Sequence, residues 1–253
     1  MNKNLIWIIS ILFISSFVTF SFAQDRRFQM LNQHFYPIGE KDSANLAYYS
    51  LLNEISEDES LEEFFDMEMR LVKSIRMGIN EEGGFLHKVT KTFDEYGKLS
   101  SEKTINLENN KFYAVYYENE VFIGEVIFDG LSTYENKIAA NDQAIFLDRN
   151  EFEPTPFTNK QLCQKNLIKN LRYPTTARSL RETGTVMLVL LVDQDSNLVR
   201  IEVANPMDVA KSLAEEAVRV AKLYKGKFIA ANNIEGNPIE AWLPIPIRFK
   251  LGN

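Results

Sequence analysis

The run from Thr185 to Val192 constrains the fold of this chain most, because nearly every residue in it is apolar. Its β-branched side chains favour a strand, and its short length argues against a helix. Both odd and even positions are apolar, so we expect this strand to be covered on both faces, or to meet a partner on one. The polar turn Asp193–Asn197 then predicts that Leu198–Val203 returns as an antiparallel strand.

A helix is predicted to follow this hairpin. Ser212 and Glu215 have the spacing of a capping box, in which two side chains satisfy the free backbone N–H groups at a helix start. Apolar residues continue at helical spacing, which predicts a face that packs against a sheet. These residues are Leu213, Ala217, Val220, Ala221 and Tyr224.

The end of the chain has prolines at positions 244 and 246. Residues two apart in a strand point their amides the same way, so Pro244 and Pro246 remove donors from one side only. Ile245 and Ile247 can still pair inward, and we therefore predict an edge strand. Two roles for the prolines stay open, namely limiting how a partner strand pairs and protecting the edge from aggregation.

In their order along the chain, these elements resemble the TonB carboxy-terminal domain over residues 173–251. The resemblance implies a small antiparallel sheet packed by helices. It also implies that the last strand binds an envelope protein, such as a TonB-dependent outer-membrane transporter. The residues that carry the motif are Tyr173, Pro174, Ala177, Gly184, Gly236 and Pro238, and those expected to bind a partner are Ala241, Leu243, Ile245, Ile247 and Phe249. The chain departs from the family pattern at the turn Asp195-Ser196-Asn197 (usually Asp-Gly), at Phe228 (usually Trp) and at Ala230 (usually Pro).

The N-terminal segment predicts export to the periplasm. Residues 1–23 read as a signal peptide, with small residues at Ser21 and Ala23 that predict cleavage between Ala23 and Gln24. The alternative is an uncleaved inner-membrane anchor, which would suit a TonB-type energy transducer in TonB-dependent transport. The chain has only 8 prolines and no Pro-rich spacer to cross the periplasm, which argues against that alternative.

Between these ends we predict an acidic, helical segment over 24–66, an antiparallel β-meander over 67–154 and a linker or helix over 155–172. The helix is expected from Asp42 or Ser43 to Ile55. Short strands are predicted from Met67 to Phe128, with a helix as the alternative for the first of them. Aromatic and glycine pairs in this region weakly resemble MORN-like repeats, and a sheet without repeats is the alternative.

Composition and motifs argue against several functions. The formal charge of −7 disfavours nucleic acid or an anionic lipid surface as partner. His34 and His87 lie far apart in the sequence, and no nucleophile, metal or phosphate-binding motif is present. We therefore expect no enzymatic activity, no cofactor, no metal and no small-molecule substrate. Cys163 has no second cysteine to pair with, and is expected either as a buried apolar side chain or as a labile thiol.

Overall fold

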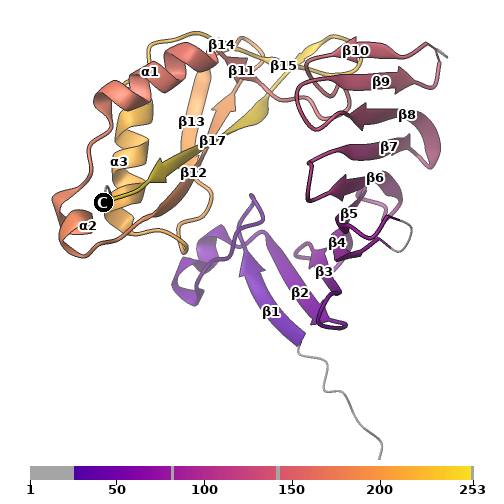
Figure 1. Ribbon diagram of the computed structural model, residues 1–253, viewed down its shortest axis with the longest axis horizontal. Coiled ribbons are helices and arrows are strands. Elements are labelled where there is room, and N and C mark those ends of the chain that lie inside the picture. The colour runs from indigo at the N-terminus through magenta and orange to yellow at the C-terminus, as the bar shows by residue number, and fades with distance from the viewer. Residues whose placement is uncertain (1–25, 81–82, 141–142, 252–253) are drawn as a thin grey trace, which may run out of the picture.

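The computed structural model describes residues 26–80, 83–140 and 143–251. The chain forms a long antiparallel sheet over residues 26–147, which we call the meander, and a region of helices and short sheets over residues 157–251, which we call the C-terminal module (Figure 1). The predicted α+β class, with a meander before a small helix-packed sheet, is confirmed.

The meander is a 10-stranded sheet in which each strand pairs with the next along the chain. Its strands are β1 (Arg26–Leu31), β2 (Tyr48–Glu54), β3 (Ser60–Phe65), β4 (Leu71–Ile79), β5 (Leu86–Phe93), β6 (Leu99–Asn106), β7 (Phe112–Glu118), β8 (Val121–Phe128), β9 (Tyr134–Ile138) and β10 (Ile145–Leu147), and a short 3-10 helix, η1 (Glu40–Asn45), lies between β1 and β2. Most residues of β5 and β6 are only half-buried.

The helix expected from Asp42 or Ser43 to Ile55 is wrong. Strand β2 occupies the second half of that range and pairs with both β1 and β3, so backbone pairing on two sides outweighs the helical spacing of its apolar residues. The strand expected from Met67 begins instead at Leu71. Asp66 explains this difference, because its carboxylate accepts the backbone N–H groups of Glu68 and Arg70 and closes a turn there.

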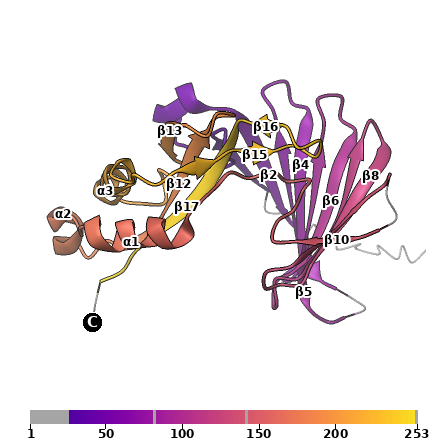
Figure 2. The ribbon, with the colours of Figure 1, turned by 90° about the horizontal axis from the view of Figure 1, so that it is seen from above.

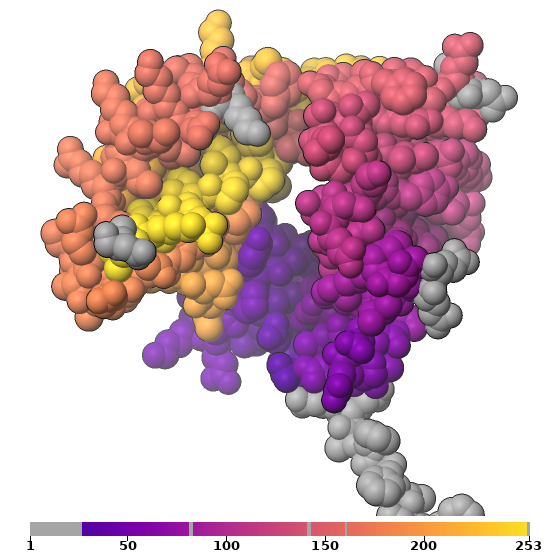
Figure 3. Space-filling model, viewed as in Figure 1, coloured from indigo at the N-terminus to yellow at the C-terminus, as the bar shows by residue number. Residues whose placement is uncertain are grey.

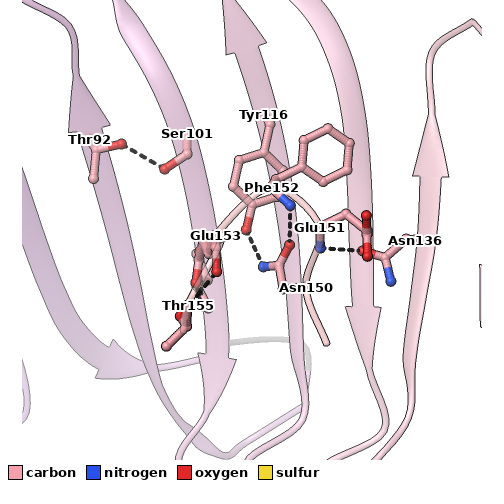
Figure 4. A network of polar contacts seen from close by, with 10 residues as sticks. Thr92, Ser101, Tyr116, Asn136, Asn150, Glu151, Phe152, Glu153 and Thr155 are labelled. Carbon is pink, nitrogen blue, oxygen red and sulfur yellow. Dashed lines mark hydrogen bonds and ion pairs between the residues drawn. The ribbon is translucent and has the colours of Figure 1, made fainter. Parts of the chain in front are cut away.

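Residues 148–156, which we call the strap, cross one face of β6–β9 on their way to the C-terminal module (Figure 4). Phe152 stacks on Tyr116 with the ring centroids 4.6 Å apart, and Asn150 donates a hydrogen bond to the Tyr116 hydroxyl at 2.7 Å. Phe152 has room to lie there because β8 has a glycine, Gly124, directly beneath it. The buried Asn136 accepts the backbone N–H of Glu151 at 3.0 Å and fixes the start of the strap.

The C-terminal module contains a three-stranded antiparallel sheet in the order β13-β12-β17. Its elements are β11 (Phe157–Thr158), α1 (Lys160–Asn170), α2 (Thr175–Ser179), β12 (Gly184–Val192), β13 (Leu198–Val203), α3 (Lys211–Lys222), β14 (Phe228–Ile229), β15 (Ala231–Asn232), β16 (Pro238–Ile239) and β17 (Ala241–Phe249). The predicted strand over 185–192, its antiparallel return and the position of the last strand at an edge are all confirmed.

The main core lies between this sheet and the helices, which gather on one face of it (Figure 2). Leu213, Ala217, Val220 and Ala221 of α3 are buried there, as their spacing predicts. The predicted capping box at Ser212 and Glu215 is wrong, however. The helix begins at Lys211 with Ala210 as its N-cap, so Ser212 already lies inside it and caps nothing.

The opposite face of β12 is buried as well, because Val189 and Leu191 on that face are each 7 % exposed. In the loop after β1, the Asn32 side chain donates to the carbonyl of Ala204 at 2.8 Å. His34 hydrogen-bonds Glu202 at 2.7 Å, and its ring meets Trp242 edge-on at 4.7 Å. The meander and the module thus meet here and again at the strap, and Figure 3 shows an opening between them. The apolar run of β12 is therefore covered on both faces, as its composition predicts.

The signal peptide, with cleavage between Ala23 and Gln24, falls outside the described residues. Within the described ranges, no helix is long and apolar enough to cross a membrane.

Candidate protein-interaction edge

The hydrogen bonds of Met187 fix which groups of the sheet point outward. Its N–H donates to the Asn205 side chain at 2.8 Å, and its carbonyl accepts from Ala204 at 2.8 Å, so both point toward the β13 side. Hydrogen-bonded and non-hydrogen-bonded pairs alternate in an antiparallel ladder, and Met187 faces Pro246 across β12 and β17. The amide nitrogen of Pro246 therefore points away from the sheet, and so does that of Pro244.

Backbone groups on the outer edge of β17 come from the alternate residues Trp242, Pro244, Pro246 and Arg248. This edge offers four carbonyls but only two N–H donors, one near each end. Pro244, Pro246 and Arg248 are exposed, and the C-terminal strand, yellow in Figure 3, lies at the molecular surface. An extended segment that paired along the whole edge would lack two hydrogen bonds, worth about 1 kcal/mol each.

The five residues expected to bind a partner lie in β17, but their backbone N–H and C=O groups point inward, toward β12. Their backbone groups pair with β12, as in the pairs Ile245–Leu188 and Ile247–Val186. Leu243, Ile245, Ile247 and Phe249 pack their side chains into the core under the helices. The groups available to a partner therefore belong to the residues between them. The spacing of the two prolines already contained that information, because proline marks the outward amides.

The motif residues form the frame of the module. Tyr173 donates its hydroxyl to the carbonyl of Glu182 and meets the ring of Phe249 edge-on at 5.8 Å. Pro174 precedes α2 as its N-cap, and Ala177 of α2 is fully buried. Gly184 begins β12, and Pro238 lies in β16. Gly236 has φ 83° in the turn before β16, a conformation that glycine adopts without strain.

Residues 169–251 match the family model described as Gram-negative bacterial TonB protein C-terminal. This match supports the TonB C-terminal family for the segment that holds the three-stranded sheet and α3. No curated protein and no solved structure matches the chain. The MORN-like resemblance of the meander remains a prediction.

Charged residues hold the start of this TonB C-terminal-like edge in place. The Arg200 guanidinium lies over the Trp242 ring, 5.2 Å from its centroid, and its Nε is 3.1 Å from the Glu202 carboxylate. Burial raises the pKa of Glu202, but hydrogen bonds from His34 and Gln33 and the charge of Arg200 lower it by more, so the net shift is downward. Trp242 is therefore ordered by contacts from β13 and from the loop after β1.

Other candidate groups do not gather into a reaction centre. His34 is used in the contact with Glu202, and His87 lies in β5 of the meander. Cys163 lies half-buried in α1, where burial raises the pKa of its thiol. Over the described parts of the chain, no group of three His, Cys, Asp or Glu side chains is placed to hold a metal ion. In the acidic segment before β4, Glu59 forms an ion pair with Arg76.

Proposed function

We propose that this protein is a non-enzymatic cell-envelope protein that binds another envelope protein through the outer edge of β17. The match of residues 169–251 to the TonB C-terminal family supports an envelope role and a periplasmic location. The observation that carries the proposal is the unpaired backbone on the outer side of β17, flanked by the donors of Trp242 and Arg248. Addition of an extended strand to such an edge is an established mode of peptide recognition.

The two prolines restrict what this edge accepts. A partner strand gains hydrogen bonds at the two ends of β17 and finds only carbonyl acceptors in the middle. A partner strand presents both N–H and C=O groups to this edge, so its donors meet the Pro244 and Pro246 carbonyls while two of its own carbonyls stay unpaired, at a cost of about 1–3 kcal/mol each if buried. The edge is therefore protected against pairing with arbitrary strands.

Photo-crosslinking in native cells tests this proposal. A photoreactive amino acid at Arg248 should form an adduct with an envelope protein, because that side chain lies on the open edge. The matched control places it at Val199, an exposed residue of β13 on the opposite edge of the same sheet. No adduct from position 248, or equal adducts from both positions, would contradict the proposal.

A second candidate is a TonB-type energy transducer in transport across the outer membrane. The same family match and the apolar N-terminal segment favour it. Intact mass of the protein purified from envelopes separates the two candidates. A mass that begins at Gln24 supports the first, and a mass that includes Met1–Ala23 supports the transducer.

A further inference from the structure

Three lysines surround one threonine on the inner face of the meander, the face crossed by the strap. Thr90 of β5 pairs with Lys103 of β6, and Lys88 follows on the same face two residues along β5. Lys73 of β4 pairs with Thr92, the next residue of that face in the other direction. From the ordinary strand spacings of about 4.8 Å across and about 6.8 Å per two residues, Lys88 and Lys103 have their Cα atoms about 8 Å apart.

This arrangement brings the like charges of Lys73 and Lys88 near each other. Lys73 lies over the rings of Phe35 and Phe64, at 4.6 and 5.1 Å from their centroids. Burial lowers the pKa of Lys73, the charge of Lys88 lowers it further, and Glu62 offsets only part of this. Among the described residues, neither Lys73 nor Lys88 has a carboxylate within salt-bridge distance. Like charges held together at a cost in stability are a mark of functional sites.

Four acidic residues line the same cleft as the lysines, namely Asp66, Asp94, Glu95 and Glu153. The carboxylates of Asp66, Asp94 and Glu153 are already hydrogen-bonded. Glu153 of the strap binds Lys103 at 2.8 Å and accepts the Tyr116 hydroxyl at 2.7 Å. The Asp66 carboxylate accepts a hydrogen bond from Nε of Arg70 at 2.7 Å. These carboxylates border the lysines without neutralising Lys73 and Lys88, in a chain whose formal charge is −7.

The lysines line a cleft of about 660 Å³. Hydroxyl groups share it, since Thr90 and Thr92 lie between the lysines, and Thr92 contacts the Ser101 hydroxyl at 2.7 Å (Figure 4). Phe35 and Tyr48, stacked 4.3 Å apart, form one wall. Ammonium groups and hydroxyls that line one cleft beside an apolar wall suit a small anion with an organic body.

We propose that this cleft binds a small organic dianion, a phosphate monoester or a dicarboxylate, with Lys73 and Lys88 as its principal ligands and the Thr90 hydroxyl between them. The sequence indicated no small-molecule substrate, because these lysines lie on three different strands and only the register of the sheet brings them together. The site is separate from the edge of β17, so it goes beyond the proposed function.

Isothermal titration calorimetry on the purified chain tests the site with glycerol 3-phosphate in one arm, succinate in the other and glycerol as the neutral control. We expect saturable binding of at least one anion and none of glycerol. Lys88→Met should weaken that binding at least tenfold. Lys91→Met is the matched control, because Lys91 is on the same strand but on the opposite face, paired with Glu102 at 3.0 Å, and it should leave binding unchanged.

Thermal unfolding without ligand separates a binding role from a structural one. If the lysines are held for a ligand, Lys88→Met should leave the melting temperature unchanged or raise it, since it removes repulsion. Should Lys88→Met instead fold poorly, Lys88→Arg keeps the charge and should keep the binding. Absence of saturable binding by both anions, or an equal loss of affinity in Lys91→Met, overturns the proposal.

Discussion

The hydroxyl of Ser196 accepts a hydrogen bond from the backbone N–H of Ala230 at 3.0 Å. This contact ties the hairpin turn of the module to the segment after β14, and it joins two positions where the chain departs from the TonB C-terminal pattern. A glycine at 196 would have no hydroxyl, and a proline at 230 would have no N–H. The serine at 196 and the alanine at 230 therefore depend on each other, because this hydrogen bond needs both.

Substitution of Ser196 should separate the hydrogen bond from the backbone conformation. Ser196 has φ 67°, which is costly for a residue with a side chain. Ser196→Ala keeps that cost and loses the hydrogen bond, so it should lower the free energy of unfolding by about 1 kcal/mol. Ser196→Gly loses the same bond but relieves the backbone, so it should be nearly neutral. Chemical denaturation of both variants checks this, and an equal effect would contradict the account.

Gly124→Ala should release the strap from the meander. A Cβ at this position would lie 2.5 Å from the carbonyl oxygen of Lys137 and 2.1 Å from the ring of Phe152. The backbone oxygen cannot move without disturbing the pairing of β8 with β9, so we expect a loss of several kcal/mol in unfolding free energy. Hydrogen exchange should show faster exchange of the Glu151 and Phe152 amides. Gly97 cannot supply the control, because its φ of 78° would strain any side chain placed there. The control is Ala114→Gly on β7, the strand paired with β8.

Asn205→Ala should loosen the start of β12. The buried Asn205 side chain accepts the Met187 N–H and donates to the Thr185 carbonyl at 3.0 Å, so it continues the ladder where β13 has ended. Its removal leaves two backbone groups without partners and should cost about 2–4 kcal/mol in unfolding free energy. Asn233→Ala in an exposed turn is the comparison, and it should cost less. Urea denaturation measures both, and equal losses would count against this role.

Acid should weaken the contact between the meander and the module. The net pKa of Glu202 lies below its ordinary value of 4.5, so the folded state favours the carboxylate more than the unfolded state does. Its contribution to stability is present above pH 4.5 and is lost as the pH falls through the lowered folded pKa. The wild type should therefore lose more unfolding free energy than Glu202→Gln between about pH 5 and pH 3. Parallel stability curves would show that the contact contributes nothing.

The sequence predicted the parts of the fold that depend on local patterns. The apolar run of β12, the alternate prolines of β17 and the apolar face of α3 were each readable from residue spacing. The start of α3 was not, because Ser212 and Glu215 have capping-box spacing, whereas the N-cap of the helix is Ala210, two residues before Ser212. Long-range pairing also overrode local spacing in β2, which lies between two other strands.

The candidate site was predicted in part for a similar reason. The strand was found, but its outward residues were not assigned, since that assignment needs the register with β12 that Met187 fixes. The contact of His34 with Glu202 joins residues far apart in the sequence and left no local pattern. The lysine cleft likewise exists only once three strands are aligned.

The central claim is that backbone donors on the outer edge of β17 bind the partner strand. Arg248→Pro removes one of the two outward N–H groups and leaves the ladder with β12 intact, while Arg248→Ala removes only the side chain. The measurement is affinity capture, from native membranes, of the envelope protein that the crosslinking experiment identifies, with each of the two variants as bait. We expect Arg248→Ala to retain most of the captured partner and Arg248→Pro to lose most of it. Equal capture by the two variants would contradict it.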